Sequence, residues 1–439
     1  MVHRCQHRIV NRFNTHVFAA LLLTDGLSSG VAADLVPSSL LPHSGATLGM
    51  RLEVAQTWTE LMEVLGHDDS FRDQHWGIQP LSARAPALAG SFSLSDVRSA
   101  VAEGELLVGQ NSFLVRNPES FEMAPGLRSG SLLTAEALEA GLSNGTMVLN
   151  DAAASWVQLF DVVRAGVRAL GLPVGVNVYI THSSLERSTP LHTDRQDVLV
   201  MQCEGQKHWR VHGPLVRFPA EHQERGKAGD RIKATEVGPT LVDTTLSPGD
   251  LLYIPRGFVH TTIAPQPAEA AAATAAATTT ATTTSQGSFS TSLTIGIQTE
   301  SMGFTYDKLL LCGLFLNGDG PNLEELRALT STNEALRHPL PLPGTLMDHR
   351  GPVDEQRSAA ILEGAVDELL GAWPAAVGSA PPPRARLLKA ARIIVRGHRL
   401  TLEMYEKRMF DTQVPRKLRQ EIWKRRYQEV FYKMLGQCG

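Results

Sequence analysis

Two histidines and one aspartate are the residues whose types and spacing most clearly suggest chemistry. His192 and Asp194 stand two residues apart in the run PLHTD, and His260 ends the run GDLLYIPRGFVH. On a β-strand, residues i and i+2 point to the same face, so His192 and Asp194 can direct two ligand groups at one point. With His260, two imidazoles and one carboxylate would leave three positions open on a metal ion, which is the facial triad of non-haem Fe(II) oxygenases.

The tripeptide alone is weak, because a His-x-Asp run also arises by chance on a surface strand beside an unrelated acid. The context of the second histidine strengthens the metal interpretation. His260 follows a PGD turn, an apolar strand and a PRG turn. A sheet protein with this order would carry the last imidazole inward, toward the other two ligands.

The spacing of apolar residues predicts the elements that position these ligands. Apolar residues with helical spacing predict helices at 53–65 and at 151–170. A further helix is expected to begin near Ser93, which has capping-box spacing with Asp96. After Gly171 the period changes to two, and strands are expected at Val174–Thr181, Val198–Cys203, His208–His212, Leu251–Pro255 and Ser292–Gln298. Short strands at this spacing predict a β-sandwich or barrel, of which the double-sheet jelly roll is one form.

Several motifs, taken in order, resemble the ribosomal oxygenase family, a JmjC-type cupin group of histidyl hydroxylases and lysine demethylases. They are NVYIT (177–181), HTD (192–194), DVLVMQCEGQKHWRV (197–211), PGDLLYIPRGFVH (248–260) and SLTIGIQT (292–299). The segments FRDQHWGIQPL (71–81), NGTMVLN (144–150) and EALRHPLPLPG (334–344) extend the resemblance on both sides. Ordered motifs over about 320 residues are far more specific than any one of them.

The resemblance implies an α+β fold, a double-stranded β-helix (cupin jelly roll, JmjC type) with flanking helices and a helical C-terminal region. It implies Fe(II), 2-oxoglutarate as cosubstrate, and dioxygen. By position, His192, Asp194 and His260 match the metal ligands and catalytic centre. Lys207 and Thr294 match the contacts to the distal carboxylate of 2-oxoglutarate, and Asn177 and Tyr179 match substrate contacts.

The function that follows is hydroxylation of a protein side chain, a histidine or arginine of a ribosomal protein. Two alternatives stay open, a histone lysine demethylase with the same site and a non-catalytic metal-binding cupin. The chain departs from the family at Thr193, where an aromatic residue is usual, and at Gly296, where a serine is usual. It also departs in the segment before His192, SSLERSTPL (183–191), where the family has a Gly/Ser-rich segment. These departures leave the triad intact and change the pocket wall.

Changes in composition, including an Ala/Thr-rich and a Pro-rich segment, predict the domain organisation of the 439 residues. An N-terminal extension (1–50), either targeting or disordered, precedes a catalytic domain (51–302), whose Ala/Thr-rich insertion (265–287) is expected to be a surface loop. A helical, dimerisation-like region (303–373), a Pro-rich linker (374–383) and a basic helical tail (384–439) follow. By resemblance the protein would be a homodimer. No apolar run is long enough to span a bilayer.

The net charge of −4 conceals an uneven distribution. Residues 384–433 hold 15 Lys and Arg against 5 Asp and Glu, so the tail is basic and the remaining chain is acidic. A basic tail could contact ribosomal RNA or chromatin, although a basic helix face is more often simply solvated. Family resemblance favours the nucleus or nucleolus, whereas Arg4, Arg8 and Arg12 near the N-terminus are also typical of a mitochondrial or plastid transit peptide.

Overall fold

The computed structural model describes residues 47–108, 113–117, 120–123, 130–143, 145–183, 185, 187–219, 223–227, 229–263, 289–299, 305–315, 328, 333–341, 344, 346, 352–373 and 381–409. The chain divides into two compact units. One runs from Leu52 to Glu300 and carries the strands of both sheets, and the other includes the helices after Ser301.

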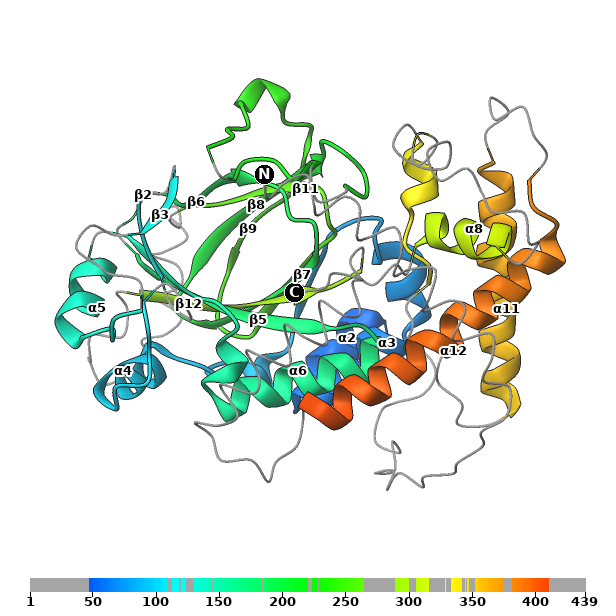
Figure 1. The fold of residues 1–439 in the computed structure, drawn as a ribbon. Coiled ribbons are helices and arrows are strands. Elements are labelled where there is room, and N and C mark those ends of the chain that lie inside the picture. Colours follow the sequence, from blue (N-terminus) through cyan, green and yellow to red (C-terminus); the bar gives the residue numbers. More distant parts are fainter. Residues whose placement is uncertain are drawn as a thin grey trace. The chain divides into compact units, whose positions relative to one another are not determined.

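The first unit is built on two antiparallel sheets that face each other (Figure 1). Its strands are β1 (Leu81–Arg84), β2 (Phe113–Asn117), β3 (Ser120–Met123), β4 (Thr146–Leu149), β5 (Val174–His182), β6 (Arg187–His192), β7 (Asp197–Glu204), β8 (Lys207–Pro214), β9 (Thr240–Leu246), β10 (Asp250–Ile254), β11 (Phe258–Ile263) and β12 (Phe289–Ile297). The larger sheet has the order β1-β10-β7-β12-β5-β4-β2-β3, and the smaller has the order β6-β11-β8-β9.

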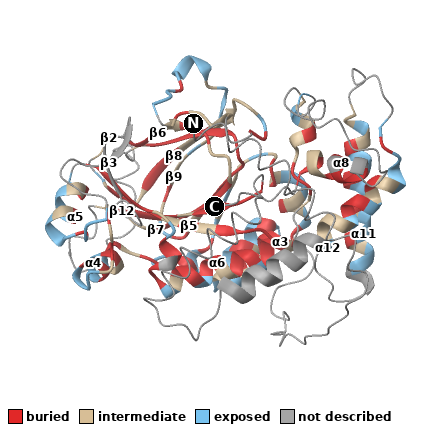
Figure 2. Ribbon diagram, viewed as in Figure 1, coloured by how far each residue is buried: buried red, intermediate tan, exposed pale blue. Residues whose placement is uncertain are grey.

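Strands β5 to β12 form the jelly roll that the sequence predicts. Successive strands alternate between the two sheets, except that β8 and β9 are neighbours in the smaller one. Strands β5, β7, β10 and β12 therefore lie in the larger sheet, and β6, β8, β9 and β11 in the smaller. Apolar side chains from both sheets, among them Val200, Val211 and Leu252, fill the space between them. Figure 2 shows buried residues along both layers. The α+β double-stranded β-helix is therefore confirmed.

The helices of this unit are α3 (Trp58–His67), α4 (Leu94–Ala102), α5 (Ala135–Leu142) and α6 (Val157–Leu170). In the sequence, the boundary between the two units falls within a short α2 (Leu48–Glu53). The capping box at Ser93 is confirmed, since its backbone N–H donates to Asp96 Oδ2 at 2.8 Å. Gly171 ends α6 with φ of 67°, the left-handed conformation of a helix C-terminus.

Two predicted helices begin later than expected. The first starts at Trp58 rather than at residue 53, because the Thr57 side chain accepts from Glu60 N–H and caps it there. Val54 is consequently outside the helix and 48% exposed. The third starts at Val157, after a 3₁₀ turn at Ala152–Ala154. Apolar periodicity continued across both turns, which is why the sequence did not reveal the breaks.

The second unit contains α8 (Tyr306–Phe315), α11 (Pro352–Gly371) and α12 (Arg384–Met409). Arg384 binds Asp367 at 2.6 Å and Glu363 at 3.2 Å, so it joins α12 to α11. The predicted helix at 357–373 is confirmed with an earlier start. The part of the expected basic helical tail after Met409 and the Ala/Thr-rich insertion (265–287) lie outside the described residues. Among the residues that are described, no helix is long and apolar enough to cross a membrane.

One end of the jelly roll is held together by the buried carboxylate of Asp197. Tyr253 Oη donates to its Oδ1 at 2.7 Å, and Thr299 Oγ1 donates to its Oδ2 at 2.8 Å. Gly77 N–H donates to Tyr253 Oη at 3.0 Å, while Phe71 and Trp76 pack on the same ring. The network links β7, β10 and the chain after β12 to residues 71–77.

We expect Tyr253→Phe to destabilise the protein, because it leaves the buried Asp197 and the Gly77 N–H without their shared partner. The loss in the free energy of unfolding should be about 1–3 kcal/mol, the cost of unsatisfied buried polar groups. Urea denaturation followed by circular dichroism would measure it. A midpoint equal to that of the wild type would show that Tyr253 does not stabilise this end of the fold.

Candidate active site

The structure brings the predicted triad together between the two sheets. Ligand atoms of His192, Asp194 and His260 all lie within 4.8 Å of one another. His192 on β6 pairs directly with His260 on β11, and their ring centroids are 4.1 Å apart. Asp194 Oδ2 lies 3.3 Å from His260 Nε2. The three side chains thus form one compact group that could hold a metal ion.

The aspartate reaches this position in a way that the sequence analysis did not predict. Strand β6 ends at His192, so Asp194 is not on the same strand. Instead, Thr193 N–H donates to Arg225 O at 3.0 Å, and Thr193 Oγ1 accepts from Arg225 N–H at 2.9 Å. Gly257 N–H donates to Asp194 O at 2.8 Å. The loop before β9 and the turn before β11 therefore fix the carboxylate, in place of a continued strand.

Both histidines are held in the tautomer that a metal ligand needs. The Nδ1 of His192 lies 2.9 Å from Pro190 O, and the Nδ1 of His260 lies 3.0 Å from Phe258 O. A carbonyl can only accept, so each Nδ1 carries the proton and each Nε2 keeps a free lone pair. Burial, followed by repulsion from His260, lowers the pKa of His192 to about 3, so the ring is neutral at physiological pH.

The carboxylate is ionised despite its surroundings. Burial acts to raise the pKa of Asp194, but the Lys227 ammonium holds that pKa well below its usual range. Two imidazole nitrogens with one anionic oxygen ligand are the donor set expected for a divalent transition metal.

The triad opens into a cavity with about 360 Å³ of empty space, which includes the open solvent at its mouth. Eleven residues line it: Tyr179, Thr189, His192, Asp194, Val198, Lys207, Trp209, His260, Thr262, Ser292 and Thr294. The predicted triad, Lys207, Thr294 and Tyr179 therefore share one cavity. Asn177 is not among the residues that line it, and its Oδ1 accepts from Asp151 N–H at 3.1 Å. Its role as a substrate contact stays a prediction.

Lys207 is a buried cation with no acidic partner among the described residues. Its side chain is almost inaccessible, and its Nζ donates to Thr181 Oγ1 at 3.1 Å. Burial lowers the pKa of Lys207 to about 7. A buried ammonium without a counter-ion is costly, so the cavity is suited to receive an anion.

Two further polar groups on the cavity wall have no partner among the described residues. These are Ser292 Oγ and Trp209 Nε1, both buried. Buried donors are rarely left unpaired in native proteins unless a ligand or water occupies the site. Together with Lys207, they provide the donors that a carboxylate ligand requires.

Several of these residues could not be predicted from the sequence. Trp209 lines the cavity and stacks on His260, with ring centroids 6.1 Å apart. Thr189, Thr262 and Ser292 gave no signal, because hydroxyl residues are common on strands. Lys207 lies on β8, which is separated from the strand of His192 by β11, since β11 pairs with both β6 and β8.

Comparison with known proteins agrees with this geometry. A family model described as the JmjC domain matches residues 157–285, which include the triad and Lys207. Over these residues the chain is similar to the JmjC domain. The similarity to curated proteins is partial, because the chain covers less than a third of the length of the relatives named below.

Three relatives illustrate the likeness. The chain is 42% identical over 96 residues to ribosomal oxygenase 2 of Bos taurus (22% of this chain, 19% of the relative). It is 39% identical over 90 residues to the bifunctional lysine-specific demethylase and histidyl-hydroxylase NO66 of Drosophila persimilis (20% and 12%). Ribosomal oxygenase 1 of Gallus gallus is 30% identical over 200 residues (44% and 32%).

Among solved structures, that of the Escherichia coli ribosomal oxygenase YcfD in complex with cobalt and 2-oxoglutarate covers 69% of this chain and 68% of its own. The sequence identity is 15% and the TM-score 0.34. The assignment of the JmjC domain therefore depends on the sequence match and on the strand order described above.

We expect Asp194→Ala to remove metal binding while the protein stays folded. Loss of a direct ligand should raise the Kd for Co(II) by more than about 100-fold, the upper end of the effect of losing only an outer partner. Titration of the metal-free protein with Co(II), followed by its visible absorption, measures this. Asp243→Ala, which removes an exposed β9 carboxylate, is the matched control. Equal Kd values for the two variants would contradict the assigned site.

Proposed function

We propose that the protein is an Fe(II)- and 2-oxoglutarate-dependent oxygenase that acts on a protein side chain. One observation carries the proposal. The triad lines the same cavity between the sheets as Lys207, which has no acidic partner among the described residues. A metal site alone would suit many proteins. A metal site that shares its cavity with a buried, uncompensated cation suits a metal bound together with an anionic cosubstrate.

The chain's own residues would divide the work of binding. His192 and His260 would offer Nε2 and Asp194 would offer Oδ2, while Lys207 would bind the distal carboxylate of 2-oxoglutarate through a charge-assisted hydrogen bond. Ser292 and Thr294 would add hydroxyl donors. When bound, iron would supply the activation of dioxygen that lets 2-oxoglutarate oxidation be coupled to oxidation of a substrate C–H bond.

Tyr179 would serve as a neutral donor on the cavity wall. Burial, together with the nearby Asp194 charge, raises the pKa of Tyr179 to about 12, so its hydroxyl stays protonated across the physiological range. The phenol can therefore donate to a substrate or cosubstrate oxygen without adding a charge beside the metal ligands.

For the substrate we propose a histidine or arginine of a ribosomal protein. Relatives are named ribosomal oxygenases, and one name also includes a histidyl-hydroxylase. The same name includes a lysine-specific demethylase, so removal of methyl groups from histone lysine is the second candidate. Both reactions begin at a C–H bond next to the same metal.

We also propose a homodimer and a nuclear or nucleolar location, by analogy with the relatives. The Arg-containing N-terminus supports a mitochondrial or plastid alternative. The basic segment 384–433 supports contact with ribosomal RNA or chromatin, because 15 basic residues outnumber 5 acidic ones there.

Turnover tests the proposal directly. The full chain, supplied with Fe(II), ascorbate and 2-oxoglutarate, should release succinate, and Asp194→Ala should release none. Ribosomal protein peptides should gain the mass of one oxygen, whereas demethylation of a methyllysine histone peptide would remove one methylene and release formaldehyde. Mass spectrometry separates these outcomes. Metal binding without iron-dependent succinate release, with or without peptides, would favour the non-catalytic cupin.

The titration of Lys207 predicts a pH dependence of 2-oxoglutarate binding. Burial lowers the pKa of Lys207 to about 7. The side chain is therefore mainly an ammonium below pH 7, whereas above pH 7 the neutral amine must first gain a proton to bind an anion. The Kd for 2-oxoglutarate, measured with Co(II) in the metal site, should therefore rise about fivefold between pH 7 and pH 8.

Lys207→Met provides the matching variant. It should weaken 2-oxoglutarate binding by at least about tenfold through the loss of a charge-assisted bond, remove the pH dependence, and leave the Kd for Co(II) unchanged. Lys233→Met, which changes an exposed lysine before β9, is the control. Loss of metal binding in Lys207→Met would contradict the role assigned to Lys207.

A further inference from the structure

The loop between β8 and β9 reaches into the metal site. Its residues 223–227 lie against the end of β6, where Arg225 pairs with Thr193. Gly226 adopts φ of +78°, and a Cβ there would lie 2.6 Å from His192 Cα. Only glycine permits both this conformation and this close approach. The loop is thus fitted to the strand end that carries the ligands.

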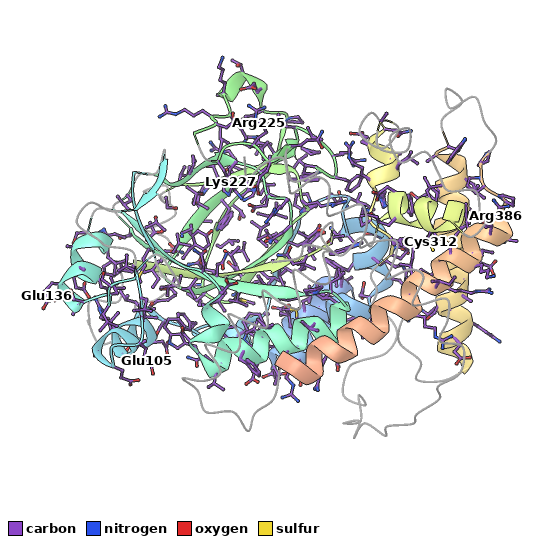
Figure 3. The ribbon with its side chains drawn as sticks, in the orientation of Figure 1. Glu105, Glu136, Arg225, Lys227, Cys312 and Arg386 are labelled. Carbon is purple, nitrogen blue, oxygen red and sulfur yellow. The ribbon has the colours of Figure 1, made fainter. Side chains whose placement is uncertain are left out.

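This close contact at Gly226 places the next residue, Lys227, beside Asp194. Its Nζ binds Asp194 Oδ1, and it also binds Glu224 Oε1 at 2.8 Å. Glu224 Oε1 in turn accepts from Arg195 N–H at 3.3 Å. The lysine is held from both sides and is one-third exposed. Figure 3 shows Arg225 and Lys227 at the side of the smaller sheet, with Lys227 nearer the space between the sheets.

The two oxygens of Asp194 therefore have different neighbours. Oδ1 carries the Lys227 ammonium, whereas Oδ2 lies 3.3 Å from His260 Nε2, the atom that His260 leaves free for a metal. A carboxylate that binds a metal with both oxygens uses two coordination positions. With Lys227 on Oδ1, Oδ2 is the oxygen that lies next to the His260 ligand atom.

We propose that Lys227 is a positioning residue that restricts Asp194 to metal binding through one oxygen and so keeps a coordination position open for the cosubstrate. This inference rests on the proposed function, since it assumes a metal at the triad. It adds a residue outside the triad, on a loop that the sequence motifs do not include.

The proposed role has an unusual electrostatic consequence. The ammonium shares a carboxylate with the metal, so it repels the metal and withdraws charge from the ligand. Removing the ammonium should strengthen metal binding, because the repulsion from Lys227 is lost and both carboxylate oxygens become available to the metal. The same change should weaken binding of 2-oxoglutarate, because the second oxygen then occupies a position that the cosubstrate requires. A purely structural lysine would not produce opposite effects on the two ligands.

Lys227→Met tests this with Co(II) as the probe. The metal-free variant should bind Co(II) at least about tenfold more tightly than the wild type, and its visible spectrum should differ because the carboxylate binds through both oxygens. Addition of 2-oxoglutarate should change the Co(II) spectrum less in the variant, at a higher Kd. Lys227→Arg should restore the wild-type spectrum, and Lys233→Met, on the same loop, should match the wild type.

The outcomes separate the two proposals. Unchanged or weaker Co(II) binding by a folded Lys227→Met protein would overturn the role of Lys227. If that variant does not fold, Lys227→Gln removes the charge at similar size and must show the same direction of change. A wild type that binds Co(II) but does not respond to 2-oxoglutarate overturns the proposed function alone, and the Co(II) Kd then decides on Lys227. A wild type that binds no Co(II) overturns both.

Discussion

The antiparallel pairing of β6 with β11 is the constraint on which the site depends. His192 and His260 are direct partners in this register, so backbone hydrogen bonds alone bring the two imidazoles within reach of one ion. A slip of one residue in β6 would turn His192 to the face opposite His260. The register is stabilised from both sides, because β11 also pairs with β8, and hydroxyl contacts join Thr189 to Thr262 at 2.7 Å.

The cavity behind the triad is built at a cost to stability that only a ligand can offset. Lys207 is buried against Thr181 without a counter-ion among the described residues, and Ser292 Oγ and Trp209 Nε1 are buried without partners there. Groups of this kind weaken a fold. Their convergence on one space next to the triad is therefore more informative than the triad itself, because a scaffold with no ligand would gain from replacing them.

Short, ordered patterns predicted the strand alternation between residues 174 and 298 and the grouping of His192, Asp194 and His260. Lys207 was predicted from the family resemblance. Local patterns do not predict positions that depend on long-range contacts. That Asp194 lies beyond β6 follows from Thr193 pairing with Arg225, 32 residues away, and no local pattern signals that pairing. Trp209 and Ser292 were missed for the same reason, since their strands alone do not show which face meets the cavity.

The charges of the site explain why a metal and an anionic cosubstrate would bind together. Without ligands, Lys227 neutralises Asp194, and Glu224 leaves these three side chains with one net negative charge. A divalent cation alone would still leave one uncompensated positive charge in a buried space, close to Lys227. A dicarboxylate alone would reach Lys207 but would lack a partner for its other end. When both bind, their charges cancel, so each should raise the affinity for the other by the same factor. Lys227 strengthens this coupling, because it makes the site a poorer host for the metal by itself than for the pair.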